Sequence, residues 1–496
     1  MEEFSVQNTH EALKNKLLDY ITTAYFGKND DLREMCIDEI KKKGVLWQEP
    51  YIEANTAYKS INNGISNSNL PEDVKEILAS LVDYKLGVFP SPYQHQIEAI
   101  ESFYKGNDLL VATGTGSGKT ECFMWPMVTK LIREAKNTPK TWSMHGVRAI
   151  MLYPMNALVT DQIGRLRKMI GDSKGDFHQL FDQICDEDNR YPTFGMYTGR
   201  TPYPGNQTLS KDSDLADTLE RDLVNKSSEI QEQLFSLGKF PSKHNLKHYI
   251  EELRNGRHVT DFFDAEMITR LEMQKESPDI LITNYSMLEY MLMRTVEQNI
   301  WKQTKEWLNS STENKLLFII DEAHMYKGAS GGEVALLIRR FLNKLNIDRS
   351  KVQFILTTAS MPSNSTETIN QFFCDLTAAN NANNLKYITG VKDELNLNKM
   401  IEPNPLLLSS FDISTLHKPT PEKLKAVKQF AELANLDYKA CSFDNEKDVE
   451  NWLYTNLSHF GPLLRRLVEE MQHHLVSYLK KHFQINQLKQ LSKLLV

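Results

Sequence analysis

The feature that most constrains this chain is a short apolar run followed at once by a glycine-rich loop. Leu109–Ala112 has the composition of a buried strand, and Thr113–Thr120 continues as Thr-Gly-Thr-Gly-Ser-Gly-Lys-Thr before a helical pattern begins. A strand, loop and helix in this order direct backbone N–H groups and the positive end of the helix dipole at a phosphate. The pattern predicts an α/β fold with a phosphate-binding loop, and it disfavours the alternative of a flexible glycine turn.

The residue types in this loop predict a magnesium nucleoside triphosphate as its ligand. We expect Lys119 to reach the β- and γ-phosphates and the Thr120 hydroxyl to bind Mg²⁺, so that ATP and Mg²⁺ are the expected cofactors. Threonine stands at position 113, where the strict pattern has glycine. The loop residues that we expect to contact the nucleotide are Gly114, Thr115, Gly116, Ser117, Gly118, Lys119 and Thr120.

Two neighbouring carboxylates follow a second apolar run. Leu316–Ile320 leads directly into Asp321-Glu322-Ala323-His324. Ligands bind at the carboxyl edge of parallel sheets, so we expect Asp321 to bind Mg²⁺ and Glu322 to orient and deprotonate the attacking water. Alone, such a pair is usually part of a solvated loop, and it is the phosphate loop upstream that favours the catalytic interpretation.

Apolar runs alternate with helical patterns between residues 89 and 395, which predicts a parallel sheet with covering helices. The pattern turns helical and highly charged at about residues 203–272, which indicates a helical insertion. We further expect a helical accessory domain at 1–88 and a helical linker at 396–496. The five runs that predict strands are Leu109–Ala112, Arg148–Tyr153, Ile280–Thr283, Leu316–Ile320 and Val352–Leu356.

The loop and the Asp-Glu-Ala-His segment resemble motifs I and II of superfamily 2 DEAD/DEAH-box helicases, which have a RecA-like P-loop NTPase fold. Phe89–Gln96 resembles the Q motif of that family. The resemblance implies that Gln96 hydrogen-bonds adenine and that Tyr93 also belongs to the nucleotide site.

Three further segments occur in the order that the family has. Tyr153–Gln162 resembles motif Ia, while Tyr197–Thr201 and Ile282–Leu288 resemble the Ib and Ic segments. In the family these segments hold one nucleic-acid strand by its phosphates, without reading the bases. Any one of them alone could be an ordinary loop. The implied contact residues are Pro154, Asn156, Gln162, Thr198, Gly199, Thr283 and Asn284.

A last segment resembles motif III, which couples the two motor domains. The usual Ser-Ala-Thr of the family is replaced by Thr358-Ala359-Ser360. The resemblance implies that Thr358 and Ser360 couple His324 to a second motor domain.

The sequences of two segments, Met273–Tyr285 and Asp321–Arg340, are similar to those of large bacterial helicases, some of them found in phage-defence gene clusters. Those proteins continue into a second motor domain, which supplies arginine fingers. No candidate for these arginine motifs is found in this sequence, and both Arg pairs, Arg339-Arg340 and Arg465-Arg466, fall on predicted helices with surface or packing roles. We therefore expect a first motor lobe with low turnover, from a split-gene subunit, a truncated product or a fragment.

Composition adds few constraints on function. A net charge of −7 gives no bulk attraction to nucleic acid, so any phosphate-binding surface must be local. Five scattered cysteines without a C-x-x-C pair argue against a disulfide framework or a zinc cluster. Without a signal-peptide or membrane-span pattern, we expect a cytoplasmic protein.

We expect an ATP-dependent helicase or translocase acting on nucleic acid, with DNA preferred and RNA left open as an alternative. A non-enzymatic subunit that binds nucleotide or nucleic acid and a restriction-type duplex translocase remain as alternatives.

Overall fold

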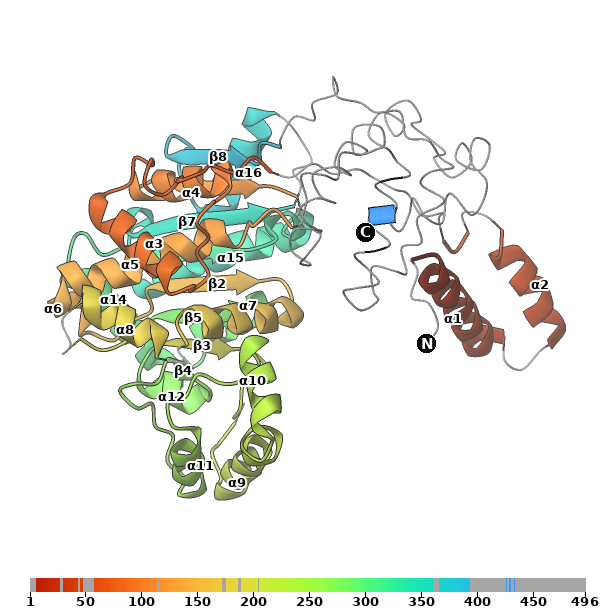
Figure 1. Cartoon of the computed structure of the whole chain (residues 1–496), viewed down its shortest axis with the longest axis horizontal. Helices are drawn as coiled ribbons and strands as arrows, with labels where there is room; N and C mark the ends of the chain where they lie inside the picture. Colours follow the sequence, from red (N-terminus) through yellow and green to blue (C-terminus); the bar gives the residue numbers. More distant parts are fainter. Residues whose placement is uncertain are drawn as a thin grey trace. The chain divides into compact units, whose positions relative to one another are not determined.

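The chain divides into two compact units, Met1–Ala57 with Asp393–Val496, and Tyr58–Lys392 (Figure 1). In the first unit, α1 (Val6–Phe26) packs against α2 (Asp30–Ile40). The expected linker at 396–496 lies outside the described residues, except for four isolated positions. The computed structural model describes residues 6–26, 30–42, 45–47, 58–114, 116–171, 175–185, 189–203, 205–359 and 365–392, with 425, 428, 429 and 432.

The second unit is built on a parallel sheet of eight strands in the order β4-β3-β5-β2-β6-β7-β1-β8. All five predicted strands are present, and β3, β4 and β8 are added to them. The α/β fold and the parallel sheet are thereby confirmed. The strands are β1 (Asp108–Ala112), β2 (Ala149–Tyr153), β3 (Phe194–Tyr197), β4 (Glu266–Met267), β5 (Ile280–Asn284), β6 (Leu316–Ile320), β7 (Val352–Thr358) and β8 (Leu385–Thr389).

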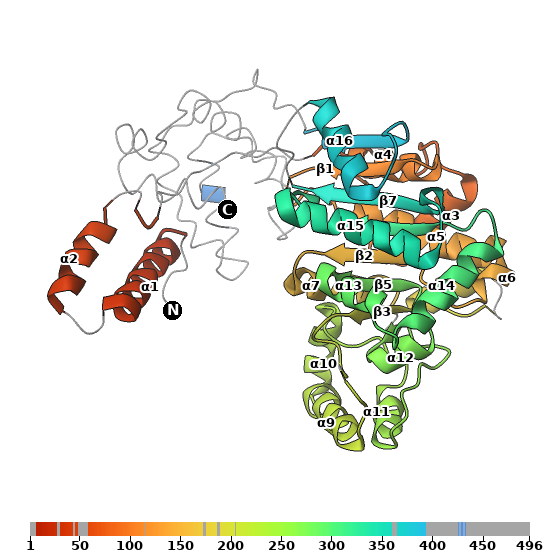
Figure 2. The ribbon, with the colours of Figure 1, turned by 180° about the vertical axis from the view of Figure 1, so that it is seen from behind.

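Helices cover both faces of this sheet. Figure 1 shows one covering layer in front of the strands, and Figure 2 shows the other from behind. The first layer contains α3 (Glu72–Asp83), α4 (Gln94–Tyr104), α5 (Glu121–Asn137), α7 (Asn156–Met169) and α8 (Asp176–Ile184), with the short α6 (Pro139–Trp142) after α5. The second contains α13 (Tyr285–Met293), α14 (Gln298–Ser310), α15 (Gly328–Leu345) and α16 (Thr366–Thr377). Two single turns, η2 (Ala323–Met325) and η3 (Arg349–Lys351), precede α15 and β7.

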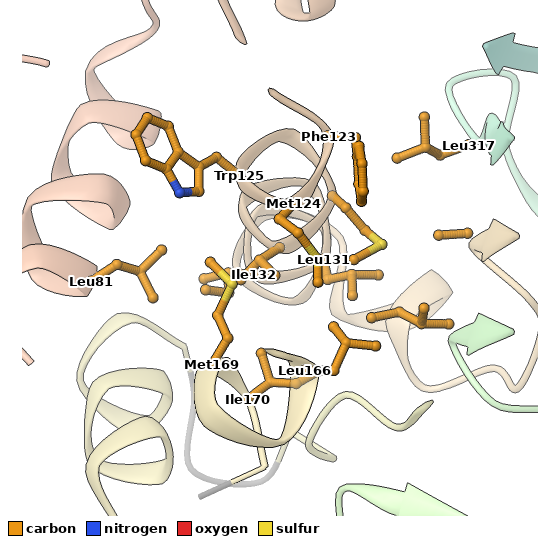
Figure 3. Packing of buried hydrophobic residues seen from close by; sticks show 14 of the residues in the cluster. Leu81, Phe123, Met124, Trp125, Leu131, Ile132, Leu166, Met169, Ile170 and Leu317 are labelled. Carbon is orange, nitrogen blue, oxygen red and sulfur yellow. The ribbon is translucent and has the colours of Figure 1, made fainter. Parts of the chain in front are cut away.

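Alternation along the buried strands divides the core between the two layers. In β6, Leu317 and Ile319 belong to the first apolar cluster, while Leu316, Phe318 and Ile320 belong to the second. Successive side chains of a strand point to opposite faces, so a strand buried on both sides must be apolar throughout. Helix α5 lies at the centre of the first cluster, and Figure 3 shows its side chains packed among those of neighbouring helices and β6. This packing fixes the helix that follows the phosphate loop.

The insertion is mostly helical, but it also supplies the edge strand β4, which pairs with β3. The predicted helical insertion did not include this strand, because its two residues form no recognisable apolar run. The other elements are α9 (Leu209–Leu219), the π-helical turn η1 (Glu220–Val224), α10 (Ser228–Ser236), α11 (Leu246–Arg254) and α12 (Arg270–Lys275).

The boundary expected at residue 88 differs from the limit of the compact unit, which begins at Tyr58. Helix α3 belongs to the second unit because its buried residues Ile77, Leu78 and Leu81 share the core cluster of α5. A helical pattern predicts which face of α3 is buried but not against which partner.

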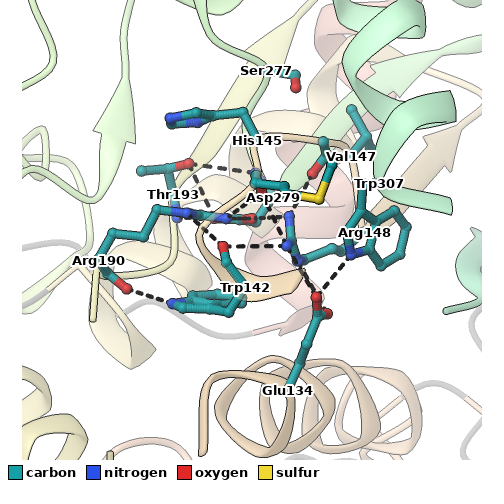
Figure 4. Close-up of polar contacts among 12 residues, drawn as sticks. Glu134, Trp142, His145, Val147, Arg148, Arg190, Thr193, Ser277, Asp279 and Trp307 are labelled. Atoms are coloured by element: carbon teal, nitrogen blue, oxygen red, sulfur yellow. Dashed lines mark hydrogen bonds and ion pairs between the residues drawn. The ribbon is translucent and has the colours of Figure 1, made fainter. Parts of the chain in front are cut away.

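A cluster of charged side chains holds the amino edge of the sheet together. Arg148 precedes β2, and its guanidinium binds the Asp279 carboxylate at 2.9 Å and the Glu134 carboxylate at 3.0 Å. Arg190 binds the other oxygen of Asp279 at 2.7 Å, and the Thr193 N–H donates to the same oxygen (Figure 4). Because Asp279 precedes β5 and Thr193 precedes β3, the cluster aligns the starts of three strands. The run predicted to begin at Arg148 therefore forms a strand only from Ala149 onward.

No helix of the described part is long and apolar enough to cross a membrane. The same residues contain no group of three or more histidine, cysteine or acidic side chains that could bind a metal ion by themselves.

Candidate active site

The carboxyl edge of the sheet brings the predicted segments together in two halves. The phosphate loop follows β1, the Asp321-Glu322 pair follows β6, and β7 lies between these two strands. The segments implied to bind nucleic acid follow β3, β5 and β2, which are neighbours on the other side of β6. Strand order therefore places the residues expected to bind nucleotide beside the residues implied to bind nucleic acid along one edge.

The phosphate loop uses glycine where the backbone turns through left-handed conformations. Gly116 and Gly118 have φ angles of 74° and 72°, which are costly for residues that carry a Cβ. A Cβ at Gly118 would also collide with the Gln96 amide nitrogen. Thr113, which replaces the usual glycine, accepts a hydrogen bond of 2.6 Å from Ser117 Oγ and so closes the loop internally. Thr115 lies outside the described residues.

The Q-like segment forms hydrogen bonds with backbone carbonyls of the phosphate loop. Gln96 Oε1 accepts a hydrogen bond from the Tyr93 N–H at 2.9 Å, and Gln96 Nε2 donates to the Gly118 carbonyl at 3.1 Å. His95 Nε2 lies 2.8 Å from the Ser117 carbonyl, and burial lowers the pKa of His95, which favours the neutral ring as a donor. These contacts make Gln96 and His95 anchors of the loop, while the adenine contact of Gln96 and the role of Tyr93 remain predictions.

Asp321 is buried at the end of β6 and is oriented by its neighbours. Its Oδ1 accepts hydrogen bonds from the Thr357 hydroxyl and from the Glu322 N–H, the latter at 2.9 Å. Burial raises the pKa of the Asp321 carboxyl, with the nearby Glu322 charge acting in the same direction. A cation bound beside this carboxylate would lower that pKa again.

Glu322 lies between the phosphate loop and β7. Its backbone is left-handed, with φ 50° and ψ 45°, an uncommon conformation for a residue other than glycine. Its Oε1 is 3.6 Å from the Lys119 ammonium, and its Oε2 is 3.2 Å from His324 Nδ1. His324 Nδ1 also lies 3.2 Å from the Thr358 hydroxyl. The structure thus connects Lys119, Glu322, His324 and Thr358, while Ser360 lies outside the described residues.

Several buried polar atoms around this centre have no hydrogen-bond partner among the described residues. They include Lys119 Nζ and the hydroxyls of Tyr153 and Tyr326. Burial raises the pKa of both tyrosines, and the Asp321 charge adds to the effect. Sequence reasoning missed these two tyrosines, although Tyr153 ends a predicted strand and Tyr326 follows the Asp-Glu-Ala-His segment. An ammonium without a hydrogen-bond partner, a glycine-lined loop and a buried carboxylate fit a magnesium nucleotide, with Thr120 and Asp321 as the residues that would bind the metal.

The residues implied to bind nucleic acid divide into exposed and buried groups. Asn156 and Asn284 lie side by side, because Asn284 Nδ2 donates to Asn156 Oδ1 at 2.6 Å. Gly199 is exposed and Pro154 is half-buried. Thr198, Thr283 and Gln162 are buried, with exposed fractions of 1%, 0% and 5%. Contact with a strand through these three side chains would require rearrangement, and the implied role of all these residues remains a prediction.

The insertion supports the Ib-like loop through a residue that the sequence did not single out. Arg270, at the start of α12, is 2% exposed and donates from Nη2 to the Thr198 carbonyl at 2.6 Å. Its guanidinium lies over the Tyr197 ring, 5.1 Å from the centroid. The exposed Arg200 follows at the tip of the same loop. A lone arginine in a charged insertion carries no sequence signal for this role.

A cavity of about 760 Å³ lies beside the end of the phosphate loop. Thr120 and Glu121 line it at the start of α5, Arg165 and Lys168 line it from α7, and Phe89 lines it from the segment before α4. Arg165 binds Glu121 at 3.2 Å across this space.

Comparison with known proteins places these features in a family. The model of the DEAD/DEAH box helicase family matches residues 93–190 and 242–369. Over 93% of its length the chain is 36% identical to Druantia protein DruE of Escherichia coli (strain UMEA 4076-1), covering 26% of that protein. It is 20% identical to an uncharacterised ATP-dependent helicase of Methanocaldococcus jannaschii, covering 54% of this chain and 26% of that protein. The chain thus spans about a quarter of the length of these two relatives.

Solved structures of helicases also match. The DUF1998 helicase MrfA bound to DNA aligns with 82% of this chain and 44% of its own, at 18% identity and a TM-score of 0.35. The yeast DEAD-box splicing factor Prp28 aligns with 69% of this chain and 54% of its own, at 17% identity and a TM-score of 0.37. The resemblance to DEAD/DEAH-box helicases that the sequence suggested is confirmed by the family match, and the parallel sheet agrees with the RecA-like fold that it implied.

Proposed function

This chain contains a DEAD/DEAH box helicase domain, and on that premise we propose that it is the ATP-binding lobe of a nucleic-acid helicase or translocase. The observation that carries the proposal is the arrangement of one sheet edge. The phosphate loop and Asp321-Glu322 occupy one half, and the Ia-, Ib- and Ic-like segments occupy the other. Changes at the nucleotide can therefore reach the nucleic-acid half through β6 and β7.

In the proposed reaction each polar group has one task. The loop amides and Lys119 bind the phosphates of ATP. Thr120 and Asp321 would hold Mg²⁺, which would supply neutralisation of charge on the transferred phosphoryl group. Glu322 accepts the proton of the attacking water. The 3.2 Å contact between Glu322 and His324 connects that carboxylate to Thr358 at the end of β7. His324 and Thr358 are the residues through which we expect a second motor lobe to sense the nucleotide.

The nucleic acid is proposed to be DNA, gripped by its phosphates on one strand. The half-buried amides of Asn156 and Asn284 and the exposed Arg200 guanidinium at this edge suit phosphate contacts without base reading. We propose a cytoplasmic role in defence against phage, because the sequences of the motifs resemble those of helicases from phage-defence gene clusters. A second motor lobe, in the same polypeptide or in another chain, completes the proposed enzyme.

The test is phosphate release from ATP by the purified chain, with and without single-stranded DNA and in the presence of a second motor lobe. Glu322→Gln removes the base but keeps a side chain of the same size, so we expect stimulated hydrolysis to disappear while nucleotide binding stays nearly unchanged. Stimulated hydrolysis that survives in Glu322→Gln would contradict the assignment of the base. Nucleotide and DNA binding with no hydrolysis under any condition would favour a non-enzymatic subunit instead.

A strand-displacement assay separates the remaining alternative. A helicase releases the displaced strand of a forked duplex. A duplex translocase of restriction type displaces a bound triplex-forming strand while leaving the duplex paired.

A further inference from the structure

A tyrosine from the start of the second unit contacts the phosphate loop directly. The Gly114 N–H donates a hydrogen bond of 3.0 Å to the Tyr58 hydroxyl. The Tyr58 ring lies 5.3 Å from the His95 ring and 5.9 Å from the Tyr93 ring, and Tyr93 stacks on His95 at 5.5 Å. Because His95 also binds the Ser117 carbonyl, Tyr58 and the Q-like segment hold the loop at two points.

The segment that carries Tyr58 is itself held on both sides. Residues 58–61 form backbone hydrogen bonds with Val391 at 2.8 Å and with Pro92 and Gln94 at 2.9 Å. The Tyr58–Lys392 and Ser60–Tyr93 pairs are antiparallel bridges. We call residues 58–61 with 390–392 the clasp. A Cβ at Gly390 would collide with the Tyr58 ring, so glycine at this position is what lets the clasp close.

Both covalent connections between the two units begin at this clasp. The units divide between Ala57 and Tyr58 and again between Lys392 and Asp393, and Tyr58 and Lys392 are paired with each other. The clasp also follows directly after β8, whose last residue Thr389 pairs with Ala112 at the end of β1. The Tyr58 hydroxyl and the backbone hydrogen bonds of the clasp therefore link the phosphate loop to both chain connections between the two units.

From this geometry we propose that Tyr58 is a positioning residue that couples occupancy of the phosphate loop to the clasp. The inference rests on the proposed function, because it requires nucleotide in the loop. Nucleotide that orders the loop strengthens the Gly114–Tyr58 contact and so stabilises the clasp. By linkage, any change that opens the clasp weakens nucleotide binding by the same factor.

The experiment compares the wild-type 496-residue chain with Tyr58→Phe, which removes the hydroxyl and keeps the ring. Titration calorimetry measures ADP affinity, and hydrogen exchange measures protection of residues 58–61 and 390–392 with and without saturating Mg-ADP. We expect Tyr58→Phe to lower ADP affinity roughly two- to tenfold, as for the loss of one hydrogen bond. We also expect it to abolish nucleotide-dependent protection of the clasp while the loop is still protected.

Two further variants make the result specific. Tyr104→Phe removes another tyrosine hydroxyl, which donates to Thr129 Oγ1 at 2.8 Å, and it should leave ADP affinity and clasp protection unchanged. Gly390→Ala adds a Cβ that would collide with the Tyr58 ring. This variant should therefore reproduce the loss of coupling. Circular dichroism melting confirms that each variant is folded.

The outcomes separate this inference from the proposed function. Wild-type chain that binds no ADP overturns both. Wild-type chain that binds ADP with the same affinity as Tyr58→Phe, or without protecting the clasp, overturns the role of Tyr58 alone.

Discussion

The Lys119 ammonium lies 3.6 Å from Glu322 Oε1, so the two groups with the most specific expected roles form an ion pair across the candidate site. Lys119 comes from the loop after β1, whereas Glu322 comes from the turn after β6, with β7 between these strands. The ammonium has no hydrogen-bond partner among the described residues. A phosphate that enters the loop would therefore draw Lys119 away from Glu322 and free the carboxylate to bind water.

Lys119→Ala should weaken ADP and ATP binding by roughly 10- to 100-fold, because a hydrogen bond to a charged group contributes about 1.5–3 kcal/mol. Titration calorimetry with Mg-ADP gives the affinity. Lys302→Ala is the matched control, since Lys302 is an exposed lysine of α14 and its loss should not alter binding. Equal ADP affinity in Lys119→Ala and the wild type would remove this loop from the nucleotide site.

The 496-residue chain alone should hydrolyse ATP slowly. An arginine finger is typically worth about 10³–10⁵ in kcat, and Arg339 and Arg340 are engaged in other contacts. Arg339 Nη1 donates to the Ala335 and Asp375 carbonyls, and Arg340 binds Glu289 at 2.9 Å. Both side chains are exposed on α15, whereas Arg465-Arg466 lies outside the described residues. Phosphate release should rise by orders of magnitude when a second motor lobe is added.

Fast hydrolysis by the chain alone would contradict this expectation. If that activity disappeared in Glu322→Gln, an arginine of this chain, or of a second copy, would have to reach the site.

Arg200→Ala should reduce affinity for single-stranded DNA equally for all sequences. Arg200 is exposed at the tip of the loop that Arg270 supports, where a guanidinium can bind one phosphate. Loss of one contact should make the slope of log K against log salt shallower by about 0.7. Fluorescence anisotropy at several salt concentrations measures both quantities. Arg221→Ala, an exposed arginine of the insertion, serves as the control, and a strong preference of the wild type for one sequence would contradict phosphate-only contact.

Asp279→Asn should destabilise the second unit by about 3–5 kcal/mol at pH 7, because it leaves the buried Arg148 and the partly buried Arg190 without their shared counter-charge. Burial alone would raise the pKa of Asp279, but Arg190 and Arg148 outweigh it and hold that pKa below 3.8. A lowered carboxyl pKa stabilises the folded state above pH 3.8, and this contribution is lost as pH falls through the folded-state pKa.

The difference in melting temperature between the wild type and Asp279→Asn should therefore shrink below pH 3.8. Asp222→Asn breaks an exposed pair with Arg221 and should change the melting temperature little at any pH. A difference between wild type and Asp279→Asn that is constant from pH 7 to pH 3 would contradict the ionic origin of the effect.

Local sequence patterns were sufficient to predict those parts of the candidate site whose functional groups lie on consecutive residues. The glycine spacing of the phosphate loop and the position of Asp321-Glu322 after an apolar run are both local, and the structure places them at neighbouring parts of one edge. Patterns were less reliable at strand ends. The run predicted to end at Leu356 continues through Thr357 and Thr358, because polar residues can extend a strand when their hydroxyls bind Asp321 and His324.

The sequence by itself determined the parallel α/β class and the choice of candidate nucleotide-binding residues, because alternating apolar runs and a glycine-rich loop act through short-range geometry. Only the tertiary structure decided which distant residues meet there. Tyr58 reaches Gly114, and Arg270 reaches Thr198, across 56 and 72 positions of sequence. Those contacts depend on strand order and on how an insertion folds back, and neither is encoded in the period of an apolar pattern.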